Sequence, residues 1–268
     1  MAIHPTAIID RRAAIDGTAD IGPYVVIDGP VVVGAGTQVL AHAVLSGDTQ
    51  IGRDNVIHYG AVIGHVPQDL SYRGAPTGLR IGDRNVIREH AEVHRATRTE
   101  RPTRLGDDNF LFARAHVAHD CQLGNGILVA SGAMLAGHCV VGDRANVSGN
   151  CVVHQYVRIG RLALLRGGSR TSRDVPPFAI MDWTHTVRAV NRIGLRRAGF
   201  TADRIRALQH AFATLFRTRR NLRAAVAEVE AGPMSTEVAE LVAFIRASTR
   251  GVCFGPKAGA GEGSEASD

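Results

Sequence analysis

Aromatic residues make up only 5% of the 268 residues, with a single tryptophan, although hydrophobic residues reach 45%. This composition disfavours a core of large rings and suits one filled by Val, Ile and Ala. No run of about 18 apolar residues occurs, so we expect no integral membrane segment. The N-terminus lacks a basic stretch followed by an apolar run, and we therefore expect a cytoplasmic protein rather than a secreted one.

The sequence also lacks zinc-finger cysteine spacings and aromatic RNA-binding motifs. The net charge of +6 therefore does not point to a nucleic-acid partner. An anionic surface or an acidic protein partner would explain the charge as well.

The dominant pattern is a period of six. From Leu105 to Leu165 every sixth residue is aliphatic, and a mostly small residue stands two positions before each. Three short runs of six return a chain to its starting face, so eighteen residues make one triangular coil. Neither a helix period nor hairpin turn signals fit this pattern. The hexapeptide repeat resembles the left-handed parallel β-helix family, and we expect a mainly β fold of that kind.

Three of the four cysteines, Cys121, Cys139 and Cys151, occupy the small inward position of the repeat. We interpret them as core fillers. Cys121 and Cys139 lie one coil apart, so a disulfide is geometrically conceivable, but reduced thiols are the rule in the cytoplasm.

The same period begins at Ile3 and is interrupted twice. Residues 64–80 and 95–104 are polar, charged or rich in Pro and Gly, and they should leave the coil as loops. Such interruptions are candidates for ligand or subunit contacts, with tolerated surface insertions as the alternative. We expect the β-helix to occupy residues 1–184.

A helical period follows. Apolar residues recur at helical spacing after Thr201, a candidate N-cap, and again after Ser235. We expect a C-terminal α-helical domain over residues 185–251 that covers the last coil. Residues 252–268 are rich in Gly, Ala, Ser and Glu, which favours a disordered tail.

Histidine is dense on one part of the solenoid. Adding eighteen moves one coil along the axis, so His119, Gly137 and Gln155 should stack in one column, and Asp120, His138 and Tyr156 in the next. Imidazoles near a carboxylate suit general-base chemistry, whereas a single histidine would more often be a solvated surface residue.

Two chemical interpretations remain open at this point. In one, His119 removes a proton from an alcohol that attacks an activated acyl group. In the other, several histidines hold a metal that activates water, as in the gamma-class carbonic anhydrases, which resemble this solenoid. A solenoid without catalysis that only binds a partner is a third possibility.

Detailed motifs favour the first interpretation. They resemble the family of acyl carrier protein-dependent UDP-N-acetylglucosamine O-acyltransferases, and the resemblance covers residues 4–251. The matching segments are His116-Val117-Ala118-His119-Asp120-Cys121, Leu135-Ala136-Gly137-His138, Val153-His154-Gln155-Tyr156, Asp174-Val175-Pro176-Pro177-Phe178 and the loop Pro67-Gln68-Asp69-Leu70.

The resemblance implies transfer of an acyl chain, expected to be 3-hydroxyacyl, from acyl carrier protein to the 3-position of UDP-N-acetylglucosamine, the first step of lipid A biosynthesis. It also implies a homotrimer with active sites between subunits. No metal or dissociable cofactor is implied, because the acyl group arrives on the phosphopantetheine of the carrier protein.

Site roles follow from the same resemblance. His119 would be the general base, Asp120 would orient it, and the Gly137 N–H would stabilise the oxyanion. The residues expected to contact the nucleotide sugar or the acyl donor are Asp69, His116, His138, His154, Gln155, Asn191 and Arg197.

The sequence departs from the family pattern at two cationic positions. Ser71 stands where the family loop has a lysine, and Ala198 where an arginine follows Arg197. Arg73 could supply the missing charge, and a different amino-sugar nucleotide is the alternative acceptor. Gly167 falls where the family limits acyl-chain length, so an open groove and longer chains are expected.

The C-terminal part is strongly basic. From Arg188 to Arg250 there are 12 arginines and no lysine against five acidic residues, a net charge of +7. This face could steer an acidic carrier protein, although a solvated helix surface would look the same.

Overall fold

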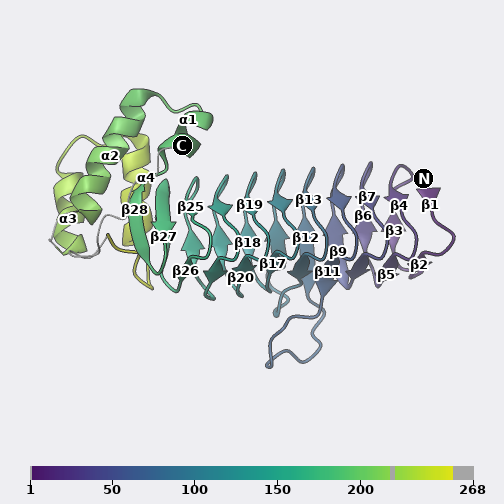
Figure 1. Ribbon diagram of the computed structural model, residues 1–268. Helices are drawn as coiled ribbons and strands as arrows, with labels where there is room; N and C mark the ends of the chain where they lie inside the picture. The colour runs from purple at the N-terminus through teal and green to yellow at the C-terminus, as the bar shows by residue number, and fades with distance from the viewer. Residues whose placement is uncertain (1, 218–220, 256–268) are drawn as a thin grey trace.

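The computed structural model describes residues 2–217 and 221–255. A three-sided prism of short strands occupies most of the length, and helices gather at its C-terminal end (Figure 1). The fold is the left-handed parallel β-helix that the period of six predicted, followed by a short helical region.

Each side of the prism is one sheet, and within the described residues neighbouring strands come from successive coils. The first sheet runs β1 (Ala2–Ile3), β4 (Asp20–Ile21), β7 (Gln38–Val39), β10 (Val56–Ile57), β13 (Val86–Ile87), β16 (Phe110–Leu111), β19 (Leu128–Val129), β22 (Asn146–Val147), β25 (Leu164–Leu165), β27 (Ala179–Asp182) and β28 (Thr186–Val190). All of its pairs are parallel except β27 with β28, which form an antiparallel end.

The second sheet carries the candidate site. It runs β2 (Ile8–Ile9), β5 (Val26–Asp28), β8 (Val44–Ser46), β11 (Val62–His65), β14 (Glu92–His94), β17 (His116–Val117), β20 (Met134–Leu135), β23 (Val152–Val153) and β26 (Arg170–Thr171). The third sheet contains β3 (Ala14–Ile15), β6 (Val32–Val33), β9 (Asp48–Ile51), β12 (Gly78–Ile81), β15 (Thr103–Leu105), β18 (Gln122–Leu123), β21 (Val140–Val141) and β24 (Arg158–Ile159).

The core is the column of aliphatic side chains that the sequence predicted. From Leu105 to Leu165 every sixth residue is buried, and the small residues two positions earlier are buried as well. Cys121, Cys139 and Cys151 lie in this core as free thiols, as expected of filler residues. Stacking successive coils therefore buries a continuous apolar interior.

A polar ladder runs through one inner corner of the prism. The Asn85 amide donates to Asn55 Oδ1 and the Asn109 amide donates to Asn85 Oδ1, each at 2.9 Å. The ladder continues when the Ile127 amide donates to Asn109 Oδ1 at 2.8 Å. Buried side-chain amides thus satisfy backbone groups at the corner.

Two loops leave the prism where the period is interrupted. The chain between β11 and β12 projects away from the prism (Figure 1), and a second segment lies between β14 and β15. The regular strand pairing continues past both loops, because Ile63 pairs with Val93 and Val93 pairs with Val117. The core is therefore continuous across the insertions.

The helices are α1 (Arg192–Arg197), α2 (Ala202–Phe216), α3 (Leu222–Glu230) and α4 (Thr236–Arg246). Thr201 and Ser235 cap α2 and α4 as predicted, whereas α1 was not predicted. Arg158 of the last coils bonds Asp174 at 2.9 Å and the Phe244 carbonyl at 2.9 Å, which joins α4 to the prism. None of the described helices is long and apolar enough to cross a membrane.

The prediction of a disordered tail from residue 252 is wrong for its first residues. Val252 pairs with Asp174, Phe254 pairs with Thr186, and Cys253 is fully buried between them. The apolar side chains of Val252 and Cys253 explain this order, because both are buried against the last coil. Residues 256–268 lie outside the described part of the chain.

Candidate active site

His119 and Gly137 meet at one corner of the prism, in the column that the sequence predicted. The His138 amide donates to the His119 carbonyl at 2.9 Å, which stacks the two coils. A Cβ on Gly137 would lie only 2.4 Å from His119 Cε1, so a larger residue would displace the ring. The glycine thus lets the backbone come into contact with the imidazole.

A carboxylate orients the His119 ring. Its Nδ1 lies 2.8 Å from Asp120 Oδ2, and each side chain is about 10% exposed. An imidazole that donates Nδ1–H to a carboxylate presents Nε2 as a proton acceptor. The pair is therefore arranged as a base with its orienting acid.

The second loop holds the Asp120 carboxylate in place. Thr97 donates its hydroxyl to Asp120 Oδ2 at 2.7 Å and its amide to both carboxylate oxygens at 3.1 and 3.2 Å. Burial raises the pKa of Asp120, but the hydrogen bonds from His119 and Thr97 outweigh burial and keep this pKa below its ordinary value. Asp120 is thus ionised at neutral pH.

His138 completes the corner. Its Nε2 lies 3.5 Å from Asp120 Oδ2, and its ring stacks on Tyr156 with centroids 4.3 Å apart. Burial lowers the pKa of His138 against the opposing effect of the Asp120 charge. The imidazole is therefore neutral at pH 7 and can donate or accept a hydrogen bond.

A groove of about 360 Å³ lies beside His119. His116, Gly137 and Gln155 line it, and the exposed apolar side chains of Met134 and Val152 continue it along the second sheet. A polar end with a base and an apolar floor suits a substrate that carries a hydrocarbon chain.

The first loop approaches the same groove. Gln68 lines it, and Asp69 Oδ2 lies 3.9 Å from His119 Nε2. The amide and hydroxyl of Ser71 donate to Asp69 Oδ1 at 2.8 and 2.7 Å and hold the pKa of Asp69 below its ordinary value. Arg73 donates to the carbonyls of Leu70 and Tyr72 within its own loop, at 2.6 and 3.2 Å.

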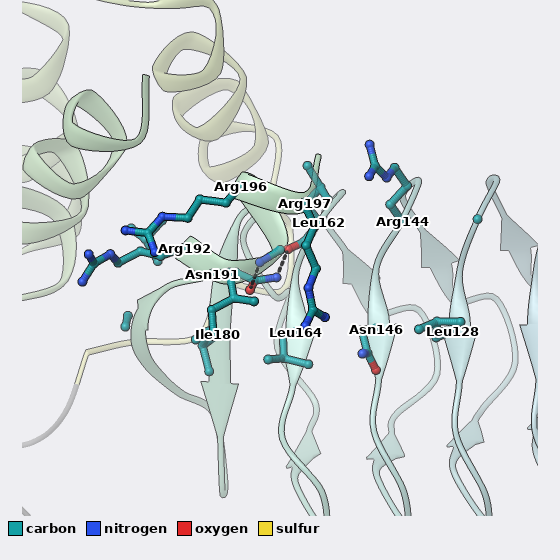
Figure 2. A pocket seen from close by; sticks show the side chains of 15 residues that line it. Leu128, Arg144, Asn146, Leu162, Leu164, Ile180, Asn191, Arg192, Arg196 and Arg197 are labelled. Carbon is teal, nitrogen blue, oxygen red and sulfur yellow. Dashed lines mark hydrogen bonds between the residues drawn. The ribbon is translucent and has the colours of Figure 1, made fainter. Parts of the chain in front are cut away.

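Two further predicted residues lie elsewhere on the same chain. Asn191 and Arg197 line a pocket of about 800 Å³ on the first sheet, where arginines surround an apolar floor (Figure 2). Asn191 is fixed there because its side-chain amide donates to the Leu162 carbonyl at 2.9 Å and its Oδ1 accepts from the Gly194 amide at 3.0 Å. Within one chain this pocket is separate from the His119 groove.

The remaining predicted residues lie beyond the groove. His154 is exposed, and its Nδ1 lies 3.3 Å from Arg250 Nη2. Gly167 lines a surface pocket of about 380 Å³ with Trp183 near the C-terminal end of the prism. Among the residues that the structure describes, a Cβ on Gly167 would meet only the Gly149 carbonyl, at 3.5 Å, so a side chain fits there.

A second group of one carboxylate and two imidazoles lies next to the first. Glu92 Oε2 lies 3.1 Å from His116 Nδ1 and 3.7 Å from His94 Nε2. Burial lowers the pKa of His94, which is only 4% exposed. Glu92 was not among the predicted site residues, although its outward position on a strand, two residues before His94, was a signal. In the described residues, this group and His119–Asp120–His138 have the spacing to hold a metal ion.

The coil and its corner histidines define the class of hexapeptide-repeat transferases. Residues 30–65 match the family model described as bacterial transferase hexapeptide (six repeats), and residues 174–253 match the second domain of UDP-N-acetylglucosamine O-acyltransferase. A curated relative from Thermodesulfovibrio yellowstonii, acyl-(acyl-carrier-protein)–UDP-N-acetylglucosamine O-acyltransferase, is 41% identical over 94% of this chain and 98% of its own length. The chain belongs to this acyltransferase family.

Solved structures give the same result. The UDP-N-acetylglucosamine acyltransferase from Bacteroides fragilis is 37% identical with a TM-score of 0.89, over 93% of this chain and 99% of its own. The enzyme from Acinetobacter baumannii is 36% identical with a TM-score of 0.90, over 94% and 99%. The likeness therefore includes the loops and the C-terminal helices as well as the repeats.

Proposed function

We propose that the protein transfers a 3-hydroxyacyl chain from acyl carrier protein to the 3-hydroxyl of UDP-N-acetylglucosamine, the first step of lipid A biosynthesis. One observation carries the proposal: the His119–Asp120 pair, 2.8 Å apart, lies against Gly137 at the polar end of an apolar groove. Family membership supplies the acceptor and the donor.

In this reaction His119 Nε2 takes the proton of the sugar 3-hydroxyl, and the hydroxyl oxygen attacks the thioester carbonyl carbon. The Asp120 carboxylate stabilises the imidazolium that forms. The tetrahedral intermediate then collapses, the thiolate of phosphopantetheine leaves, and the imidazolium returns the proton to that sulfur.

The oxyanion of the intermediate needs a donor, and the Gly137 N–H is available. Among the described residues no hydrogen bond uses this N–H. A single oxyanion donor contributes about 2.7–4 kcal/mol to the transition state. We assign this role to Gly137, which also agrees with its contact with His119.

Substrate contacts follow from the groove. The acyl chain would lie over Met134 and Val152, and Gly167 would leave the far end open. Asp69, His116, His138, His154 and Gln155 would contact the nucleotide sugar or the pantetheine. No step needs a metal or a dissociable organic cofactor.

We further propose a cytoplasmic homotrimer with each active site between two subunits. The separation of the Asn191 and Arg197 pocket from the His119 groove supports this, because threefold packing of the prism can bring one face against another. Mixing inactive His119→Ala and Arg197→Ala subunits should restore activity if the site is shared. Mixed oligomers that stay inactive would count against a shared site.

The basic helical region would receive the carrier protein. Its net charge of +7 between Arg188 and Arg250 complements an acidic partner. The rate at low donor concentration should therefore fall as salt is added. A salt-independent rate would remove this role.

The direct test uses purified protein, a panel of acyl carrier protein thioesters and UDP-N-acetylglucosamine, with products identified by mass spectrometry. A nucleotide sugar esterified at the 3-hydroxyl is the expected product, with no loss of rate on chelation. Faster transfer to a 3-amino analogue would show that the preferred acceptor is an amino-sugar nucleotide instead of UDP-N-acetylglucosamine. No transfer from any donor would overturn the proposal.

A further inference from the structure

The group of Glu92, His94 and His116 is formed by two adjacent strands. Glu92 and His94 point outward from β14, and Glu92 pairs with His116 of β17 across the sheet. One ligand atom from each residue lies within 4.8 Å of the other two. The three side chains therefore converge on one point outside the sheet.

The spacing suits a tetrahedral ion. Metal–ligand bonds of about 2.0–2.2 Å place neighbouring ligand atoms roughly 3.3–3.6 Å apart. Glu92 Oε2 lies 3.1 Å from His116 Nδ1 and 3.7 Å from His94 Nε2. Small side-chain rotations would bring all three atoms to bonding distance.

The backbone fixes the required tautomer of His94. Its Nδ1 lies 2.7 Å from the Val66 carbonyl, which can only accept, so Nδ1 carries the proton. Nε2 of the neutral ring is then left with a lone pair that faces the Glu92 carboxylate. Two acceptors that face each other at 3.7 Å favour a cation between them. A carbonyl behind a ligating imidazole is also the usual outer support of a zinc ligand.

We propose that Glu92, His94 and His116 bind a divalent transition metal, with Zn²⁺ the best match for one carboxylate and two imidazoles. The fourth position faces solvent, since the Glu92 side chain is 44% exposed. The ion would hold His116, which lines the groove beside His119. Resting on the proposed function, bound zinc then inhibits acyl transfer by competing with the nucleotide sugar.

Cobalt binding tests the site without any activity measurement. Metal-free full-length protein is titrated with Co²⁺, and the visible absorption of four-coordinate cobalt is followed, with Zn²⁺ added to displace it. We expect one ion per chain, and Glu92→Gln should weaken binding by at least about 100-fold, because loss even of an outer-shell partner costs 10- to 100-fold. No cobalt absorption at any concentration would overturn the proposal.

Two variants locate the ion. Glu89 lies 3.4 Å from one histidine, His58, and within the described part of the chain it belongs to no group of three possible metal ligands. Glu89→Gln is therefore a matched control that should bind cobalt normally. Asp120→Asn should also leave the cobalt signal unchanged. A signal lost in Asp120→Asn and kept in Glu92→Gln would place the ion at the other histidine group and refute the assignment.

Inhibition is measured separately. Zn²⁺ should raise the apparent KM for the nucleotide sugar in the unmodified protein at least tenfold more than in Glu92→Gln. Equal inhibition of both proteins would refute the inhibitory role. Absence of transfer before zinc is added would instead count against the proposed function, so the two failures are distinguishable.

Discussion

The two groups of one carboxylate and two imidazoles lie side by side but differ in how the carboxylate is held. Asp120 is about 10% exposed and accepts hydrogen bonds from His119 and from the Thr97 amide and hydroxyl. Glu92 is 44% exposed, and its partners among the described residues are the histidines His94 and His116. The same residue types therefore give a rigid base at one corner and a more adaptable ligand set at the next.

Substituting Gly137, the glycine beside His119, is the strongest test of the rigid packing at the His119–Asp120 corner. We expect Gly137→Ala to lower turnover by about 10²-fold, as loss of an oxyanion contact or a displaced base does. The added Cβ would lie 2.4 Å from His119 Cε1, so the ring must move. The measurement is kcat, together with cobalt binding as a control. Cobalt binding should be unchanged in Gly137→Ala. An unchanged kcat would show that the His119 ring can accommodate the added methyl group without loss of function.

The first loop touches both groups, because Val66 bonds His94 and Asp69 approaches His119. If Arg73 supplies the charge missing at Ser71, Arg73→Ala should raise the apparent nucleotide-sugar constant about tenfold, the value of one charged hydrogen bond. Ser71→Lys in the same chain should partly reverse the effect. If neither change alters the constant, the phosphate is held elsewhere.

Removing the Thr97 hydroxyl should leave the Asp120 carboxylate less firmly held, as the Glu92 carboxylate is. We expect Thr97→Val to lower kcat about fivefold, which is less than the full value of a hydrogen bond to a charged group, because the Thr97 amide still donates to Asp120. Thr97→Ser should restore kcat. The pKa of Asp120 is held low, so the active ionised form is lost only as pH falls through that low value. Losing a donor raises this pKa, so the acidic limb of the pH–rate profile should move to higher pH. If the acidic limb of the pH–rate profile does not move in Thr97→Val, Thr97 only packs the loop and does not tune Asp120.

Gly167 lies away from both groups, so changing it should affect chain length alone. Gly167→Met should shift preference toward shorter acyl donors with little change in the best rate, because the methionine would fill the open end of the groove. The measurement is competition among acyl carrier protein thioesters of different length. An identical chain profile would place the stop elsewhere.

Much of the fold and the stacking of residues at the candidate site could be predicted because they depend on a strict local period. The period of six identified the buried residues, and adding eighteen correctly stacked Gly137 on His119 and Tyr156 on His138. The caps at Thr201 and Ser235 were local signals as well.

The remainder depends on contacts that the period does not encode. Glu92 pairs with His116 at a separation of 24 residues, because an insertion adds six to the usual eighteen. Thr97 reaches Asp120 from an irregular loop, and no repeat predicts where a loop side chain lands. The short α1 and the docked residues 252–255 gave no periodic signal because both segments are short.

The most direct test of the central claim is the turnover of His119→Ala with saturating donor and acceptor, in protein whose melting temperature matches the unmodified chain. General-base removal predicts a loss of at least about 10²-fold, with Asp120→Asn affected less because it only orients the imidazole. A near-normal rate for His119→Ala would contradict the account, and a larger loss for Asp120→Asn would make the carboxylate the principal group.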